Sequence, residues 1–166
     1  MGCSLLKVSA VGHWDYYSEE NKVISEVQYQ ASLEVKRGYL LATRANADPD
    51  SVGRTCLVQC TRSGLMLSDK TWRIKLKNPK IASGILAWTK SSIFRKNIFK
   101  KLSGTEAKNV SQKDFLDSPF PSCSKEELQA FNSEIEVLLR NELELKNRSN
   151  NSRNFFKTLI NQILGK

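Results

Sequence analysis

The chain has 166 residues, of which 40% are hydrophobic and 26% are charged, and its formal net charge is +9. This length suits one domain, residues 1–166, and the composition is that of a folded protein rather than a disordered one. No run approaches the roughly 18 apolar residues of a transmembrane helix, and the N-terminus lacks the apolar stretch of a signal peptide. We therefore expect a cytoplasmic protein.

The N-terminal segment MGCSLLK contains two acceptor positions for lipid. Gly2 follows the initiator methionine, where myristoylation occurs, and Cys3 beside it is a position for palmitoylation. The segment resembles the dual-acylation signals of peripheral membrane proteins, although Leu6 stands where that motif prefers Ser or Thr. We predict that residues 1–12 are a lipid-anchored segment, with a chance match as the alternative.

Residues 23–35 have the clearest local pattern, an alternation of apolar and polar side chains. A period of two predicts a long strand with one buried face. The residues expected on that face are Val23, Val27, Tyr29, Ala31, Leu33 and Val35. After a turn at KRG, residues 39–44 are expected to return as the hairpin partner of this strand.

Three shorter strands are predicted at 55–60, 65–68 and 71–77. In the last one, alternation predicts an inward row and an outward basic row, respectively Trp72, Ile74 and Leu76, and Arg73, Lys75 and Lys77. After this strand the period changes to that of a helix, with Asn78 as the cap and Pro79 in the first turn. One helix to residue 102 and two shorter helices are both consistent with the sequence.

A second helical region is predicted at 124–146, where Ser124 and Glu127 form a capping box. The polar residues 147–154 predict a flexible break before a terminal amphipathic helix. Because strands come first and helices follow, we predict an α+β fold, an N-terminal antiparallel β-sheet followed by C-terminal amphipathic helices.

The excess positive charge comes from one part of the chain, residues 69–102, where Asp69 is the sole acidic residue. We call it the basic segment. Such a concentration of charge attracts polyanions, either lipid headgroups or nucleic acid. The residues predicted to bind anionic lipid or phosphate are Lys70, Arg73, Lys75, Lys77, Lys80, Arg95, Lys96, Lys100 and Lys101.

The helical part of the basic segment also has aromatic residues, as an interfacial membrane helix does. We predict that Trp88, Phe94 and Phe99 insert into a membrane, and packing of this face on the sheet is the alternative. A small, basic, acylated domain resembles viral matrix proteins in composition. This resemblance implies a non-enzymatic structural or adaptor protein at the cytoplasmic face of an anionic membrane. It also implies self-association. The C-terminal helix is the segment expected to dock on a neighbouring subunit of a homo-oligomer, and docking on its own domain is the alternative.

The same cations support an alternative function, binding of single-stranded RNA or a ribonucleoprotein. This hypothesis rests on charge, because Trp72 is predicted to face inward and provides no platform for base stacking. The two hypotheses differ in whether the aromatic side chains take part in binding.

No motif with a catalytic mechanism is present, neither a glycine-rich phosphate loop nor G-x-S-x-G nor H-E-x-x-H. We expect no enzyme activity and no cofactor. The cysteines, Cys3, Cys56, Cys60 and Cys123, are expected to be thiols in a reducing compartment. A zinc site would need His13 and cysteines from unrelated elements, so no metal is expected.

Overall fold

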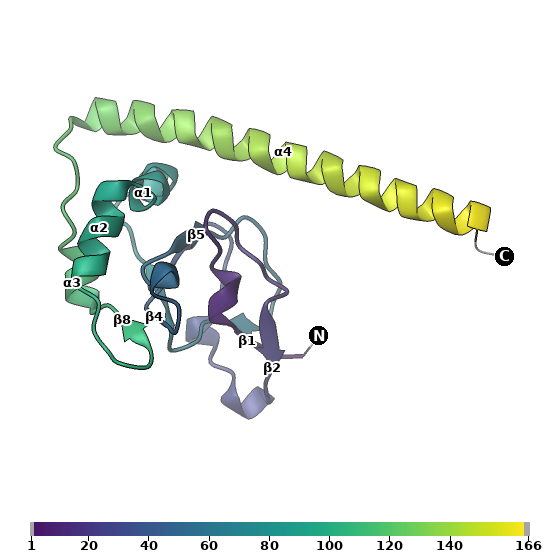
Figure 1. Ribbon diagram of the computed structural model, residues 1–166, viewed down its shortest axis with the longest axis horizontal. Coiled ribbons are helices and arrows are strands. Elements are labelled where there is room, and N and C mark those ends of the chain that lie inside the picture. Colours follow the sequence, from purple (N-terminus) through teal and green to yellow (C-terminus); the bar gives the residue numbers. More distant parts are fainter. Residues whose placement is uncertain (1, 165–166) are drawn as a thin grey trace.

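Eight short strands form three small sheets in the computed structural model, which describes residues 2–164 (Figure 1). The first sheet has the order β2-β1-β6 and consists of β1 (Ser4–Leu6), β2 (Asn21–Val23) and β6 (Leu65–Met66). The second sheet consists of a central β3 (Leu40–Thr43) flanked by β5 (Thr55–Leu57) and β7 (Thr71–Ile74). The third is a pair, β4 (Ala45–Asn46) and β8 (Lys108–Asn109).

All strand pairs except β1–β6 are antiparallel. Four α-helices follow or interrupt the strands within residues 2–164: α1 (Ala82–Thr89), α2 (Ser92–Lys100), α3 (Gln112–Leu116) and α4 (Lys125–Leu164). Short 3-10 turns complete the fold: η1 (Val8–Ala10), η2 (Glu26–Gln28), η3 (Ala31–Leu33), η4 (Pro49–Ser51) and η5 (Pro79–Ile81). The α+β prediction is confirmed.

The long strand predicted at 23–35 is wrong. β2 ends at Val23, which is 81% exposed, and Val27 is 97% exposed. Instead of pairing, the chain forms η2 and η3, and the Gln28 side-chain oxygen accepts hydrogen bonds from the Ser25 amide and hydroxyl, both at 3.2 Å. Such local side-chain bonds offer the backbone an alternative to a sheet ladder. The expected hairpin partner, β3, pairs with β5 and β7 instead.

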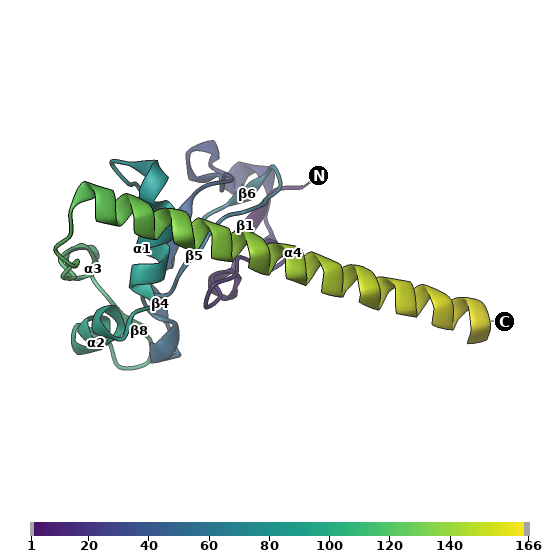
Figure 2. The same cartoon turned by 90° about the horizontal axis from the view of Figure 1, so that it is seen from above.

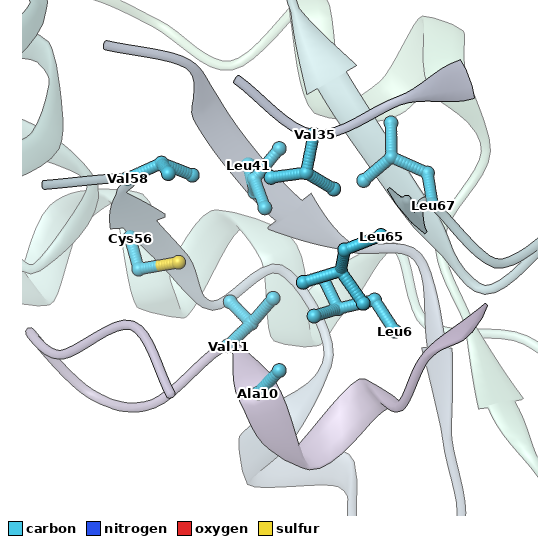
Figure 3. Close-up of a cluster of buried hydrophobic side chains, with 9 residues drawn as sticks. All are labelled: Leu6, Ala10, Val11, Val35, Leu41, Cys56, Val58, Leu65 and Leu67. Atoms are coloured by element: carbon cyan, nitrogen blue, oxygen red, sulfur yellow. The ribbon is translucent and has the colours of Figure 1, made fainter. Parts of the chain in front are cut away.

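The core joins the first two sheets. Leu6 of β1, Leu41 of β3 and Cys56 of β5 meet there, and all three are fully buried (Figure 3). The complete cluster consists of Leu6, Ala10, Val11, Val35, Leu41, Cys56, Val58, Leu65 and Leu67. Because β1 lies in this core, residues 1–12 as far as they are described are part of the folded domain and not a separate anchoring segment.

The opposite face of β3 packs against helices. Ala42 contacts Phe94 and Ile98 of α2 in a second buried cluster, against which Trp72 and Ile74 of β7 pack. Ile74 and Leu76 also pack against a third cluster between α1 and α4. The inward row predicted for 71–77 is therefore confirmed.

The two-helix alternative is confirmed for residues 81–102. Asn78 caps η5 by accepting from the Lys80 amide at 3.1 Å, and Ser91 caps α2 by accepting from the Phe94 amide at 3.2 Å. The second cap interrupts the helix between α1 and α2. Because α2 packs on the sheet through Phe94 and Ile98, its cations lie either beside this contact or on the exposed face of the helix.

The helix α4 begins at the predicted capping box, where the Ser124 amide donates to Glu127 at 2.8 Å and the Glu127 amide donates back to the Ser124 hydroxyl at 3.1 Å. The flexible break predicted at 147–154 is wrong, because α4 continues without interruption to Leu164. The Asn and Ser residues of this stretch are weaker helix formers but not helix breakers, and Arg148 and Arg153 are good helix formers, so an established helix extends through them.

The first half of α4 packs on the domain, and the contact continues as far as Lys146, which forms an ion pair with Asp15. The Gly84 amide of α1 donates to the Asn132 side chain at 2.8 Å, and Leu139 is buried between α1 and β3. Farther along, α4 extends beyond the globular part, as both views show (Figures 1 and 2). Apolar residues of this second half, such as Phe156 and Ile163, are 63% and 73% exposed. In the described range 2–164 no helix is long and apolar enough to cross a membrane.

Candidate nucleic-acid interface

The cations of the basic segment are divided between two sides of β7. Arg73 pairs with Leu41 and shares its face of the sheet, whereas Trp72 pairs with Ala42 on the face that α2 covers. Arg73 and Lys75 therefore lie on the other side of the sheet from α2 and its Arg95. The sequence predicted one basic surface, and the structure forms two groups.

The first group, which we call the strand cluster, consists of Arg37, Arg73 and Lys75. All three line an open groove of about 610 Å³ at the start of β3. The guanidinium of Arg73 donates to the Tyr39 hydroxyl at 3.1 Å and lies 4.9 Å from the centre of its ring. None of the three cations forms an ion pair with another residue in the described range 2–164. Their charged groups are therefore not paired with a carboxylate at ion-pair distance within the described residues.

A second groove, of about 570 Å³, connects the strand cluster to the segment that precedes it. Arg73 and Lys75 line one side, and Gln30 and Leu33 line another. One carboxylate, that of Asp69, also borders this groove. We call residues 24–33 the arm. In Figure 1 the chain between β2 and β3, which contains the arm, lies at the lower end of the globular part, away from α4.

The second group, which we call the helix cluster, consists of His13, Arg54, Lys90 and Arg95 around a cavity of about 220 Å³. Two of these cations, Arg54 and Arg95, donate hydrogen bonds to backbone carbonyls of the folded chain. Arg95 donates to the carbonyl oxygens of Val52 at 2.8 Å and Asp50 at 2.9 Å, and Arg54 also donates to the Asp50 carbonyl at 3.0 Å.

A glycine allows η4 and the turn after it to approach α2 this closely. Gly53 has φ of 73°, and a Cβ at this position would lie 3.0 Å from Ile98 Cγ2. A larger residue would therefore be strained in its backbone and too close to α2. The hydrogen bonds that Arg95 donates to Val52 and Asp50 therefore hold a turn that Gly53 already allows to pack against α2.

Lys90 lies deepest in the helix cluster. Its ammonium donates to the Thr55 carbonyl and lies 5.5 Å from the centre of the Trp14 ring. The pKa of Lys90 is lowered to about 8, chiefly by burial; the nearby Cys56 opposes this shift, and the charges of Arg95 and Arg54 add to it. Burial, followed by the positive charge of Lys90, also lowers the pKa of His13. The helix cluster therefore loses part of its positive charge at mildly alkaline pH.

The remaining predicted phosphate-binding residues lie at the surface. Lys70, Lys77 and Lys80 are exposed near β7 and η5, and Lys96 and Lys100 are exposed on α2. Another, Lys101, forms an ion pair with Asp114 at 3.1 Å. Sequence reasoning missed Arg37, His13 and Arg54, because they lie outside the basic segment and reach it only through the fold.

Two of the residues predicted to insert into a membrane are held inside the protein. Phe94 is 0% exposed, with its ring 5.4 Å from that of Phe115. Trp88 is half-buried between Phe94 and Phe120, at ring distances of 4.6 and 5.1 Å. Phe99 is 43% exposed. Packing on the sheet, the alternative weighed for this face, is therefore correct for Phe94, and its insertion into a membrane is ruled out in this fold.

The predicted acylation positions lie beside the first sheet. Gly2 is exposed, and its carbonyl accepts from Arg62 at 3.3 Å, whereas Cys3 is half-buried and its carbonyl accepts from the Ile24 amide at 3.0 Å. Acylation of these residues stays a prediction. Of the other thiols, Cys56 is buried, and burial raises its pKa to about 12. No group of three or more potential metal ligands occurs within residues 2–164.

The chain is similar in part to one protein of described function. Over 80 residues, which are 48% of the chain, it is 39% identical to the specificity subunit of the type I restriction enzyme EcoEI from Escherichia coli. The matched part covers 13% of that subunit, so the chain spans a small part of the relative's length. No family model matches the chain.

Proposed function

We propose that this chain is a non-catalytic module that binds double-stranded DNA through the strand cluster. The observation that carries the proposal is the group of Arg37, Arg73 and Lys75, which line one groove without ion-pair partners in the described residues. Cations in such a position release counterions from a phosphate backbone when they bind it. Such cations suit any polyanion, and the choice of DNA over single-stranded RNA and membrane is supported by the partial similarity and by the packing of α2.

The partial similarity supports DNA as the polyanion. A restriction enzyme acts on DNA, and a specificity subunit selects where it acts. An identity of 39% over 80 residues supports a related role for part of this chain. By the same reasoning the module recognises its target and leaves chemistry to other proteins, which agrees with the absence of a catalytic motif in the sequence.

Membrane binding by this chain is less well supported. An interfacial helix must turn its apolar face outward, but α2 turns Phe94 and Ile98 into the core. Ile93 and Phe99, at 64% and 43% exposure, are the apolar residues that α2 still offers to a membrane. Binding to anionic lipid is therefore one of the outcomes that the following experiment distinguishes.

The test compares three polyanions with one set of proteins. Binding of wild-type protein to labelled random-sequence duplex DNA, single-stranded RNA and phosphatidylserine vesicles is measured by anisotropy and cosedimentation. The variant Arg73→Glu/Lys75→Glu should lose at least about tenfold in affinity for the duplex. The matched control, Arg148→Glu/Arg153→Glu, makes the same charge change on the exposed half of α4 and should bind as wild type.

Each preference has its own meaning. Tighter binding to the duplex, with loss in the strand-cluster variant alone, is the result that the proposal requires. Tighter binding to single-stranded RNA than to the duplex would contradict the proposal and favour the hypothesis of an RNA-binding protein. Binding to vesicles without binding to the duplex would contradict the proposal and favour a peripheral membrane protein.

A further inference from the structure

We infer that the arm, residues 24–33, enters the major groove of DNA and reads base edges, with Val27 and Gln30 as specificity-determining residues. This inference rests on the proposed function and adds to it the part of the surface that selects sequence. Phosphate contacts position a protein on DNA, but base contacts give it selectivity. The strand cluster supplies contacts of the first kind only.

The first observation is the exposure of the arm. Val27 is 97% exposed, and Gln28, Gln30 and Ser32 are exposed as well. No hydrogen bond joins the side chain of Gln30 to any residue from 2 to 164. Its backbone alone is bonded, with the amide donating to the Met66 sulfur at 3.4 Å and the carbonyl accepting from the Leu33 amide at 2.9 Å. The tip of the arm thus presents an apolar group and an amide that the domain itself does not use.

The second observation is that the arm is held in place at both ends. The Ile24 amide donates to the Cys3 carbonyl at 3.0 Å, and the Leu67 amide donates to the Leu33 carbonyl at 2.9 Å. Just after the arm, the Glu34 carboxylate accepts from the Gly64 amide at 3.0 Å. A segment fixed in this way loses little conformational entropy when it binds, which favours a recognition role over that of a loose loop.

The third observation is the chemistry of the exposed side chains. In the major groove, Gln can form two hydrogen bonds with adenine, Glu can accept from cytosine, and an apolar side chain can contact the thymine methyl group. The arm offers Gln30, Glu26 and Val27, one of each kind. Its two 3-10 turns are also of a size to enter a groove that admits an α-helix.

The fourth observation is the place of the arm beside the strand cluster. Gln30 and Leu33 line the same groove as Arg73 and Lys75. Phosphates flank the base edges along the major groove of DNA, so a binding surface needs cations next to base-reading groups. The arm and the strand cluster meet this requirement together.

The experiment is a selection from a random-sequence duplex library. Wild-type protein should enrich a defined sequence. The variant Val27→Ser/Gln30→Ala should bind unselected DNA within about twofold of wild type but lose about tenfold in its preference for the enriched sequence. The matched control, Val137→Ser/Gln129→Ala, makes the same changes at exposed positions of α4 and should retain the preference.

The outcomes separate the inference from the proposed function. If the arm variant retains the wild-type preference, or if wild-type protein binds the library without enriching any sequence, the inference is overturned while DNA binding stands. If wild-type protein binds no member of the library, both are overturned. Because Val27 and Gln30 make no side-chain hydrogen bond with residues 2–164, both variants should fold, which circular dichroism would verify.

Discussion

The strand cluster and the helix cluster are both rich in cations, but their surroundings differ. Arg73 and Lys75 of the strand cluster line open grooves. Arg95 and Lys90 of the helix cluster donate to backbone carbonyls, and burial lowers the pKa of Lys90. Positively charged side chains can therefore either remain available to bind a partner or form hydrogen bonds that stabilise the fold. Only the surroundings of each cation decide which.

The largest effect is expected from the core beneath the helix cluster. Phe94→Ala removes a fully buried ring that packs against Trp88 and Phe115, so the free energy of unfolding should fall by about 3–5 kcal/mol. Urea denaturation followed by circular dichroism measures this loss. A change below about 1 kcal/mol would mean that α2 is not packed as described.

A smaller loss of stability is expected when a hydrogen-bond donor of the helix cluster is removed. Arg95→Met leaves the Val52 carbonyl without its side-chain donor and the Asp50 carbonyl with Arg54 alone, which should cost about 2 kcal/mol of unfolding free energy. Affinity for duplex DNA should stay within about twofold of wild type, because phosphate contacts are assigned to the strand cluster. Undiminished stability together with weakened DNA binding would reverse the roles of the two clusters.

The pH dependence of stability isolates Lys90. Its pKa is about 8 in the folded chain against a usual 10.5, so the unfolded chain binds more protons between these values. The contribution of Lys90 to the free energy of unfolding should therefore rise between pH 8 and 10.5, by about 2 kcal/mol after allowance for partial exposure. Because the raised pKa of Cys56 acts in the opposite direction above about pH 9, this rise is measured as the difference between wild type and Lys90→Met. Lys90→Met should remove this rise, and wild-type and variant curves of equal slope would contradict the assignment.

The smallest effect is expected at the exposed aromatic residue of α2. Phe99→Ser should change the free energy of unfolding by less than about 0.5 kcal/mol and leave DNA affinity unaltered. The measurement is a pair of titrations, with duplex DNA and with phosphatidylserine vesicles. Vesicle binding that depends on Phe99 would revive the membrane hypothesis for α2.

Short patterns with a local cause were predictable from sequence. The caps at Asn78 and at Ser124 depend on neighbouring residues only, and both are present. The inward row of 71–77 is also correct, because alternation on a strand is a local rule. By contrast, the alternation in 23–35 predicted one long strand, but the chain pairs only at its two ends, with β1 up to Val23 and with β6 through a single bridge at Glu34.

The composition of the candidate site could not be predicted without the three-dimensional structure. Arg37 joins Arg73 because β3 and β7 pair, and Arg54 joins Arg95 because η4 and the turn that follows it lie against α2. These are long-range contacts without a sequence signal. The arm was hidden for a related reason: Val27 fits a buried strand position by pattern, and only its 97% exposure marks it as surface.

The most direct test of the account is the salt dependence of duplex binding. Wild type, Arg73→Gln/Lys75→Gln and Lys96→Gln/Lys100→Gln are titrated with random-sequence duplex between about 50 and 200 mM salt. The second pair removes the same charge from exposed positions on α2. The account predicts that the slope of log affinity against log salt falls by about two for the strand-cluster variant and stays unchanged for the α2 variant. A reduced slope for the α2 variant alone would contradict it and would move the DNA-binding surface to the other side of the sheet.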